Sequence, residues 1–487
     1  MSLDVDPIAE TGCFIDGGWR PAVSGQTIDV NCPSDGAVFA TIAAGDAPDV
    51  DLAVAAARRA FEEGAWSQLS AVERGRLLTA LGAKIEGAAA RLTQLEAQDT
   101  GKPLAQAAAD ITAAARYFEF YGGAADKLHG ETLPFLPGYA VQTVREPHGV
   151  TGHIIPWNYP AQMFGRTLAP ALATGNAVVL KPAEDACLTP LALAGLAAEV
   201  GFPPGAINVV PGLGTAAGAA LTAHGDVDFL SFTGSAGVGV QVQTAAAQNH
   251  IACTLELGGK SPQILFDDAD LAAALPVLAG AIVQNGGQTC SAGSRALIQR
   301  GLWDRVIPAL VARFGALVAA PHDADADLGA LISARQKARV LGYLDRAGGA
   351  DAPILATGQI APDAPATGHY VAPTLIGPVA PDHVLAQEEV FGPVLVCIPF
   401  EDEAEAIRIA NATPYGLVAG IWSADGGRLM RMAKAMRCGQ VFLNGYGAGG
   451  GIELPFGGVR KSGHGREKGL AALQEFTRLK TIVHRHG

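Results

Sequence analysis

The chain has 487 residues, of which 49% are hydrophobic and 17% are charged, and its formal net charge is −13. This composition excludes a disordered chain and provides enough residues for more than one domain. An acidic balance without a basic run argues against nucleic acid as a partner, and the lack of a long uninterrupted apolar run argues against a membrane span.

Seven cysteines are scattered along the chain without a CxxC pair or another spacing typical of zinc sites. We therefore expect no metal site, and free thiols in a reducing cytoplasm. The first residues, MSLDVDP, have neither the basic nor the apolar segment of a secretory signal, which also favours a cytoplasmic location.

The first 145 residues change pattern twice. Short apolar alternations with Gly turns at 11–45 predict hairpins. Apolar residues at intervals of three and four then predict helices over 53–63, 71–98 and 103–127, with Asp49 and Asp51 opening the first as cap and dipole partners. A strand-like pattern returns at 128–145.

Short apolar strands then alternate with helical segments, which predicts parallel sheets covered by helices. The first set of predicted strands is 150–155, 177–180, 207–210 and 229–232, and the second is 263–266, 296–299, 393–398, 420–422 and 440–444. Ligands of such sheets bind at the carboxyl ends of the strands. Residues 351–381, rich in Ala, Pro and Gly, are predicted as loops, and 477–484 as a terminal strand whose free edges favour pairing with another chain.

Cys290 occupies a turn of small residues between a predicted helix at 271–283 and a predicted strand at 294–299. Asn285, Gly286 and Gly287 are expected to end that helix, because Gly readily adopts left-handed dihedral angles. A rigid turn of this kind can present a nucleophile. The competing interpretation is an inert, buried thiol that serves as a small hydrophobe.

Two further side chains have the chemistry to assist a nucleophile. Glu256, within LELGGKSP at 255–262, is a candidate for a buried general base with a raised pKa, or for a salt-bridged structural residue. Asn158, within IPWNYP at 155–160, would donate to an oxyanion, or hold its own turn.

Two stretches are candidates for binding a nucleotide. The Gly-rich segment 233–239 follows a predicted strand and opens a helix, as in phosphate-binding turns, but it matches neither G-x-G-x-x-G nor a Walker A loop. Lys181 and Glu184 would hold the ribose hydroxyls of an adenosine, with Glu184 favouring NAD over NADP, or would form a surface charge pair.

Together these stretches resemble the aldehyde dehydrogenase superfamily, in its NAD(P)-dependent, non-CoA-acylating form. The resemblance covers nearly the whole chain and rests on eight motifs in order: PWNYP at 156–160, APALATGN at 169–176, KPAE at 181–184, FTGS at 232–235, LELGGKSP at 255–262, GQTCSAGS at 287–294, EEVFGP at 388–393 and PFGG at 455–458. It implies an α/β fold with a Rossmann-type NAD-binding domain (1–127 and 147–256), an α/β catalytic domain (257–474) and a small bridging β element for oligomerisation (128–146 and 475–487).

The resemblance also implies a role for each matched residue. Cys290 would attack the aldehyde, Asn158 would hold the oxyanion of the thiohemiacetal, and Glu256 would activate the water that hydrolyses the thioester. The implied cofactor-binding residues are Ile154, Pro156, Trp157, Lys181, Glu184, Gly214, Gly218, Phe232, Gly234, Ser235, Val238, Leu257, Glu389 and Phe391. The implied walls of the substrate tunnel are Met163, Arg166, Thr289, Ser291 and Phe456.

The chain departs from the family pattern at positions that bear on the substrate. Arg166 and Thr167 stand where relatives often have an aromatic residue followed by Lys, and in parts of the family that Lys and a Glu matching Glu467 transfer protons. Arg166 would recognise a polar or anionic aldehyde, turn to solvent, or pair with Glu453. The Gly-rich loop 445–451 predicts a wider or more mobile tunnel entrance.

The resulting prediction is an NAD-dependent aldehyde dehydrogenase with a small-molecule aldehyde substrate, no nucleic-acid or membrane partner, and a homodimeric or homotetrameric assembly. One alternative is a CoA-acylating aldehyde dehydrogenase, which would commonly lack the deacylating Glu. A second alternative is a catalytically silent relative that serves as a binding or structural protein.

Overall fold

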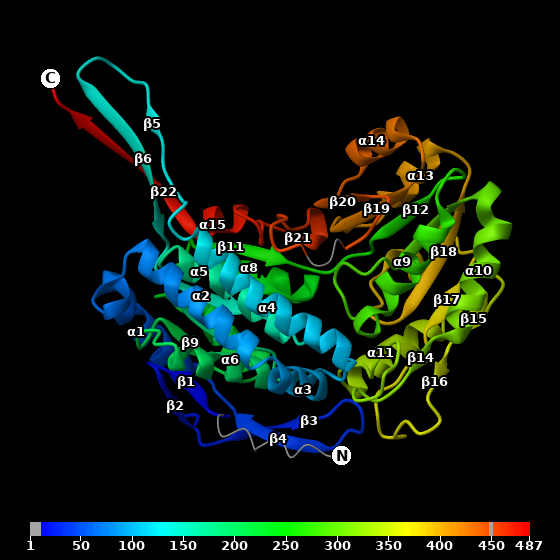
Figure 1. Ribbon diagram of the computed structural model, residues 1–487, viewed down its shortest axis with the longest axis horizontal. Coiled ribbons are helices and arrows are strands. Elements are labelled where there is room, and N and C mark those ends of the chain that lie inside the picture. Colours follow the sequence, from blue (N-terminus) through cyan, green and yellow to red (C-terminus); the bar gives the residue numbers. More distant parts are fainter. Residues whose placement is uncertain (1–10, 448–450) are drawn as a thin grey trace.

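The computed structural model describes residues 11–447 and 451–487. Two large β-sheets lie side by side with helices packed around each, and a narrow three-stranded sheet projects away from them (Figure 1). Within the described ranges, no helix combines the length and the apolar character that a membrane crossing needs. The first ten residues, on which the signal-peptide prediction depends, lie outside the described part.

The first large sheet contains five neighbouring parallel strands in the order β9-β8-β7-β10-β11. Their bounds are Val150–Ile154 for β7, Ala177–Lys181 for β8, Ile207–Val209 for β9, Phe229–Thr233 for β10 and Ala252–Glu256 for β11. Chain order reverses between β7 and β10, and ligands bind beside such a switch point in open α/β sheets. The four strands predicted at 150–232 are confirmed, and β11 adds a fifth.

The N-terminal segments complete this half of the molecule as the hairpin pattern predicted. Strands β1 (Cys13–Ile15) and β2 (Gly18–Arg20) extend the first sheet beyond β9, while β3 (Thr27–Asn31) pairs with β4 (Val38–Ala43). The packed helices are α1 (Ala47–Glu62), α2 (Ala71–Gly87), α3 (Ala89–Thr100), α4 (Leu104–Ala124), α5 (Pro160–Ala173), α6 (Leu188–Glu199), α7 (Ala219–Ala223) and α8 (Ala236–Gln248).

Two helix predictions in this region were wrong in detail. The cap of α1 is Asp46, and Asp49 completes a capping box with it, whereas Asp51 lies 3.3 Å from His224. The segment predicted as one helix at 71–98 is two helices that meet at Ala88, directly after Gly87.

The second large sheet has the order β15-β17-β18-β13-β12-β19-β20, and all its strand pairs are parallel except β15 with β17. The bounds are β12 (Pro262–Leu265), β13 (Arg295–Gln299), β15 (Ile354–Thr357), β17 (Thr374–Ile376), β18 (Val394–Phe400), β19 (Val418–Trp422) and β20 (Gln440–Leu443). Alternate residues face opposite sides, so that Ile264 and Leu297 join one hydrophobic cluster while Leu265 and Ile298 join another. The five strands predicted after residue 256 are confirmed.

The prediction of loops over 351–381 was wrong, because this segment contributes β15 and β17 to the second sheet and β16 (Gln359–Ile360) to a pair with β14 (Val318–Ala319). These strands are too short to show an alternating pattern of apolar and polar residues in the sequence. Their extended conformation is stabilised by hydrogen bonds to neighbouring strands. The helices around this sheet are α9 (Leu271–Val283), α10 (Trp303–Ala316), α11 (Ala334–Leu344), α12 (Val384–Gln387), α13 (Glu403–Ala410) and α14 (Gly426–Ala435).

The projecting sheet consists of β5 (Thr132–Leu133), β6 (Tyr139–Pro147) and β22 (Thr477–Arg485), which pair as β22-β6-β5 (Figure 1). It exposes large apolar side chains, among them Phe135, Leu136 and Leu479 at 57–61%. Two short elements precede β22 in the chain. Helix α15 (Ala471–Glu475) packs near α5, and β21 (Gly463–His464) pairs with β11. Residues 463–464 therefore lie in the first sheet, although the predicted catalytic domain included them.

Candidate active site

Cys290 lies on an irregular turn between α9 and β13, as the small-residue pattern predicted. Helix α9 ends at Val283, and Asn285, Gly286 and Gly287 follow with φ angles of 50°, 62° and 74°. A side chain at Gly287 would collide with the backbone of Gly392, so this glycine is required for close packing as well as for conformation. The turn leaves Cys290 partly exposed.

Asn158 lies beside this turn. Its side-chain nitrogen Nδ2 donates to the backbone oxygen of Gln288 at 2.8 Å, two residues before Cys290. The Asn158 carbonyl accepts hydrogen bonds from Lys102 Nζ at 2.9 Å and Asn285 Nδ2 at 2.8 Å. The predicted oxyanion donor is thus held rigidly next to the predicted nucleophile.

Glu256 ends β11 and is 2% exposed. Its Oε2 lies 3.6 Å from Nη2 of the buried Arg166, which forms a closer ion pair with Glu467 and stacks 4.5 Å from the ring centre of Phe456. Arg166 was predicted to recognise the substrate, turn to solvent or pair with Glu453. It forms an ion pair, but its partner is Glu467. Glu453 pairs instead with Arg116 at 2.8 Å.

Glu467 is also the end of a buried chain of polar side chains. Ser231 Oγ donates to Glu467 Oε1 at 3.1 Å, Thr167 Oγ1 donates to Ser231 at 2.9 Å, and His153 Nδ1 lies 2.6 Å from Thr167. Burial lowers the pKa of His153 to about 3, so the imidazole is neutral. Thr167, which replaces the family Lys, thus supplies an uncharged link to Glu467 in this chain.

Burial raises the pKa of both reactive groups. Burial raises the pKa of the Cys290 thiol to about 11, and the nearby Arg166 partly opposes this shift. Burial also raises the pKa of Glu256 well above its usual range, again against Arg166. Neither carboxylate oxygen of Glu256 has a hydrogen-bond partner among residues 11–447 and 451–487, so both keep their capacity to accept a hydrogen bond.

The first half of the candidate cofactor groove follows the ends of β8 and β9. Lys181 Nζ binds Glu184 Oε2 at 2.7 Å, and the backbone N–H of Gly214 donates to Glu184 Oε1 at 3.3 Å. Burial opposes ionisation of Glu184, but Lys181 and the hydrogen bonds outweigh it and lower its pKa. Gly218 lies against the aliphatic part of Lys181. An ionised carboxylate is therefore available for ribose hydroxyls.

The second half of the groove begins at the switch point, where β10 leads into α8. Ser235 caps α8 by accepting from Val238 N–H, and a side chain at Gly234 would collide with the ring of Phe232. Leu257 packs against Gly239 in the first turn of α8. The N-terminus of a helix with a close-approach glycine before it suits a pyrophosphate.

The far end of the groove lies against the second sheet. Gly259 N–H donates to Glu389 Oε1 at 2.9 Å, and the rings of Trp157 and Phe391 meet edge to face at 5.5 Å. Trp157 follows Ile154 and Pro156 at the end of β7. Phe391 has a φ of 60°, which α11 supports through a 2.7 Å hydrogen bond from Gln336 to its carbonyl. These residues fit the nicotinamide end of a dinucleotide.

The predicted tunnel residues come from three separate segments. Met163 and Arg166 lie on α5, Thr289 and Ser291 flank Cys290, and Phe456 packs with Cys290 in a small hydrophobic cluster. Lys468 was not among the predicted site residues, because no motif pointed to it. Its Nζ lies 5.3 Å from the Phe456 ring centre. Burial, with a smaller contribution from Arg166, lowers the pKa of Lys468 to about 7.

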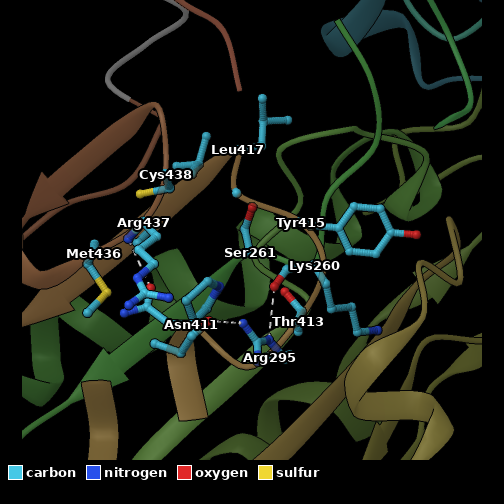
Figure 2. A pocket seen from close by; sticks show the side chains of 15 residues that line it. Lys260, Ser261, Arg295, Asn411, Thr413, Tyr415, Leu417, Met436, Arg437 and Cys438 are labelled. Carbon is cyan, nitrogen blue, oxygen red and sulfur yellow. Dashed lines mark hydrogen bonds between the residues drawn. The ribbon is translucent and has the colours of Figure 1, made fainter. Parts of the chain in front are cut away.

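A small cavity of about 20 Å³ lies between β12, β13 and β19 (Figure 2). Arg295 crosses its wall and donates to the carbonyls of Lys260, Ile409 and Ala410 at 2.9–3.1 Å. None of the predicted site residues lines this cavity, whose size suits a single water molecule.

A buried ion cluster that supports Asn158 was not predicted, because no motif in the sequence indicates it. Lys102, which donates to the Asn158 carbonyl, lies 3.3 Å from Glu96 Oε1 and 2.5 Å from Asp110 Oδ2, and all three residues are at most 3% exposed. Its ammonium also lies 4.6 Å from the ring centre of Tyr159. One cation therefore compensates two buried carboxylates under the oxyanion donor.

Replacing Lys102 with methionine is expected to lower the free energy of unfolding by about 3–5 kcal/mol, because two buried carboxylates lose the cation that they share. Urea unfolding would measure the change. Lys84→Met is the matched control, since Lys84 forms an exposed pair with Glu199 whose loss costs about 1 kcal/mol or less. Equal losses in the two variants would contradict a special role for the buried cluster.

The fold and the site define a class of protein: an α/β protein with two large sheets, in which a cysteine on the turn before β13 lies beside an asparagine that follows β7. Residues 19–482 match the aldehyde dehydrogenase family. The human mitochondrial aldehyde dehydrogenase is 41% identical over 96% of this chain and 91% of its own length. The chain belongs to the aldehyde dehydrogenase family.

Solved structures agree with this assignment. A protein from Burkholderia cenocepacia described as a candidate aldehyde dehydrogenase is 60% identical, with a TM-score of 0.97 over 98% of this chain and 100% of its own. The NAD⁺ complex of an aldehyde dehydrogenase from Bacillus cereus is 38% identical, with a TM-score of 0.95 over 98% of this chain and 97% of its own. The fold predicted from the motifs is therefore confirmed.

Proposed function

We propose that this chain oxidises an aldehyde to its carboxylic acid with NAD and hydrolyses a thioester on Cys290 in doing so. The single observation that carries the proposal is the 2.8 Å hydrogen bond between the Asn158 amide and the carbonyl two residues before Cys290. This hydrogen bond joins the segment after β7 of the first sheet to the turn that carries Cys290. One substrate carbonyl can therefore reach both the Asn158 amide and the Cys290 sulfur.

Each of the three predicted catalytic residues would act at a defined atom. The Cys290 thiolate attacks the aldehyde carbon, and the Asn158 amide together with the Cys290 backbone N–H holds the oxyanion. NAD, when bound, would accept the two electrons and the hydrogen that the adduct loses. Glu256 then takes a proton from the water that attacks the thioester and releases the acid.

Use of NAD rather than NADP is supported by the charge at the adenosine end of the groove. Glu184 is held ionised by Lys181, and a carboxylate there repels a 2′-phosphate while accepting from a 2′-hydroxyl. The related enzyme from Bacillus cereus has been crystallised with NAD⁺. Glu389 would bind the nicotinamide ribose.

The proposal is tested by measuring NADH formation from a panel of aldehydes, with and without CoA and with NADP in place of NAD. We expect turnover with NAD that does not need CoA. Turnover only in the presence of CoA would favour the acylating alternative, which the presence of Glu256 argues against. NAD binding without turnover of any aldehyde would favour a catalytically silent relative.

The ion pairs of Arg166 bear on the nature of the substrate. Its guanidinium is already committed to Glu467 and Glu256, so we propose that Arg166 compensates these carboxylates rather than reading an anionic aldehyde. Arg166→Ala should then lower kcat about tenfold or more for neutral and carboxylated aldehydes alike, because Glu256 loses the cation that opposes its raised pKa.

The same variant should shift the pH dependence of turnover upward, since Glu256 acts as a base only when deprotonated. Arg116→Ala, which removes an exposed arginine paired with Glu453, is the matched control. A rise in KM confined to carboxylated aldehydes would instead assign Arg166 to substrate recognition.

We also propose a homodimer or homotetramer in a reducing compartment, the cytoplasm in the simplest case. The assembly is supported by the exposed apolar side chains and free edges of the β5–β6–β22 sheet. The compartment is supported by seven cysteines that are all unpaired. Light scattering on the purified protein would measure the assembly.

A further inference from the structure

Two tyrosine hydroxyls bracket Cys290. The hydroxyls of Tyr159 and Thr289 share a hydrogen bond of 2.6 Å, and the hydroxyl of Tyr446 donates to the backbone carbonyl of Ser291 at 2.6 Å. These contacts fall on the residues immediately before and after Cys290. The turn belongs to no strand or helix at this point, so the two tyrosine contacts add to the few backbone hydrogen bonds that hold it, such as the one from Ala292 N–H to the Thr289 carbonyl at 3.0 Å.

Tyr159 is itself fixed in place by the first half of the molecule. It precedes Pro160 at the start of α5, is 8% exposed, and has the Lys102 ammonium 4.6 Å from its ring centre. It is also the neighbour of Asn158, whose carbonyl binds Lys102. A hydrogen bond from Tyr159 to the turn therefore ties the position of Cys290 to that of the oxyanion donor.

Tyr446 is fixed by the second half of the molecule. Its ring packs 5.7 Å from that of Phe442 and lies directly over Gly420 of β19, where an added side-chain carbon would be 2.9 Å away. Only a glycine at 420 leaves room for this ring. The Gly-rich loop, expected to widen the tunnel entrance, thus carries an aromatic side chain that packs beside Cys290, while residues 448–450 lie outside the described part.

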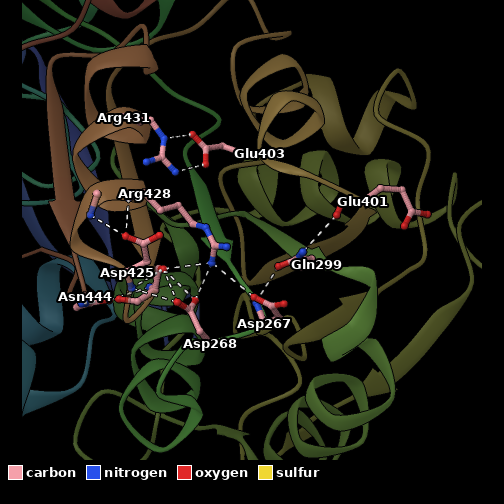
Figure 3. Close-up of polar contacts among 11 residues, drawn as sticks. Asp267, Asp268, Gln299, Glu401, Glu403, Asp425, Arg428, Arg431 and Asn444 are labelled. Carbon is pink, nitrogen blue, oxygen red and sulfur yellow. Dashed lines mark hydrogen bonds and ion pairs between the residues drawn. The ribbon is translucent and has the colours of Figure 1, made fainter.

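The base of the Tyr446 loop is held by a polar network at the surface (Figure 3). Asn444, with a φ of 53°, donates to the Ser423 carbonyl and accepts from the Ser423 N–H, both at 3.0 Å. Ser423 donates to Asp268 at 2.9 Å, and Asp268 lies 3.0 Å from Arg428. This network sets the direction in which the chain leaves β20 two residues before Tyr446.

We infer that Tyr159 and Tyr446 are positioning residues that clamp the Cys290 turn between the two sheets. Neither hydroxyl is assigned to the substrate or the cofactor, and each acts through the backbone or side chain next to the nucleophile. The distance from Cys290 to Asn158 is then set jointly by both halves of the molecule. This inference rests on the proposed role of Cys290 as the nucleophile. The position of a nucleophile matters because a displacement of about 1 Å can lower the reaction rate up to a hundredfold.

Tyr159→Phe and Tyr446→Phe test the clamp, because each removes one oxygen and keeps the ring. We expect each variant to slow the pre-steady-state burst of NADH about three- to tenfold, and the double variant to slow it further. The affinity for NAD should stay within about twofold of wild type, because neither hydroxyl lies in the cofactor groove. The rate at which iodoacetamide alkylates Cys290, measured as a function of pH, should differ between each variant and the wild type. This rate reports on the position and reactivity of the thiol independently of turnover.

Tyr370→Phe is the matched control. Tyr370 is 4% exposed and donates to the Ser34 carbonyl at 2.6 Å, the same bond length, far from Cys290. An unchanged burst rate in both test variants, or an equal loss in the control, would overturn the clamp. Cys290→Ala distinguishes a failure of the proposed nucleophile from a failure of the clamp. Turnover in Cys290→Ala would contradict the role of Cys290 as the nucleophile. Loss of turnover in Cys290→Ala, together with wild-type burst rates in both tyrosine variants, would contradict the clamp alone.

Discussion

Cys290→Ala is expected to lower aldehyde turnover by about four orders of magnitude or more, because the substitution removes the sulfur that forms the covalent adduct. NAD affinity should change by less than about twofold, since Cys290 lies beyond the groove formed by Lys181, Glu184 and the start of α8. Steady-state NADH formation and equilibrium binding of NAD would measure the two quantities separately.

Cys438→Ala is the matched control for this substitution. Cys438 is also partly buried, and burial raises the pKa of its thiol to about 11, as it does for Cys290. Its removal should leave turnover near the wild-type value. If Cys290→Ala retained more than about a hundredth of the wild-type rate, the covalent mechanism would be wrong.

Glu256→Gln is expected to keep a burst of about one NADH per site while steady turnover falls by two or more orders of magnitude. Glutamine preserves the shape of the side chain but cannot take a proton from water. The thioester therefore forms once and then accumulates. Rapid-mixing measurements of NADH would show both phases.

The pH dependence sharpens this prediction. Burial raises the pKa of Glu256, and a base is active only when deprotonated, so steady turnover of the wild type should rise with pH through that raised pKa. Glu256→Gln should lose this rise. Glu475→Gln is the control, since burial also raises the pKa of Glu475, and it lies on α15 outside the site. Full steady-state activity in Glu256→Gln would remove Glu256 from the mechanism.

Much of the fold was predictable because it depends on local periodicity. Strand β8 is buried on both faces, and its first four residues form a continuous apolar run. Helix α9 ends just before its Asn-Gly-Gly segment, because those residues readily adopt left-handed dihedral angles. Strands β15 and β17 were missed, since strands of four and three residues in a Pro-rich segment have no period to detect.

The candidate site was predictable where a residue type and its motif coincide. Cys290, Asn158 and Glu256 stand in motifs whose order along the chain matches the family, and the chain itself places the Gly-rich turn 233–239 between a strand and a helix. The same reasoning could not choose a partner for Arg166. Its choice of Glu467 over Glu453 follows from which carboxylate is buried near it.

By itself the sequence determined the alternation of strands and helices, the place of the nucleophile on a glycine-bounded turn, and the family. The tertiary structure alone decided which distant groups meet: Lys102 under Asn158, Glu467 against Arg166, and Tyr159 and Tyr446 on either side of Cys290. The physical reason is that local propensity depends on neighbours in the chain, whereas ion pairing and hydrogen bonding of buried groups depend on distances that only packing sets.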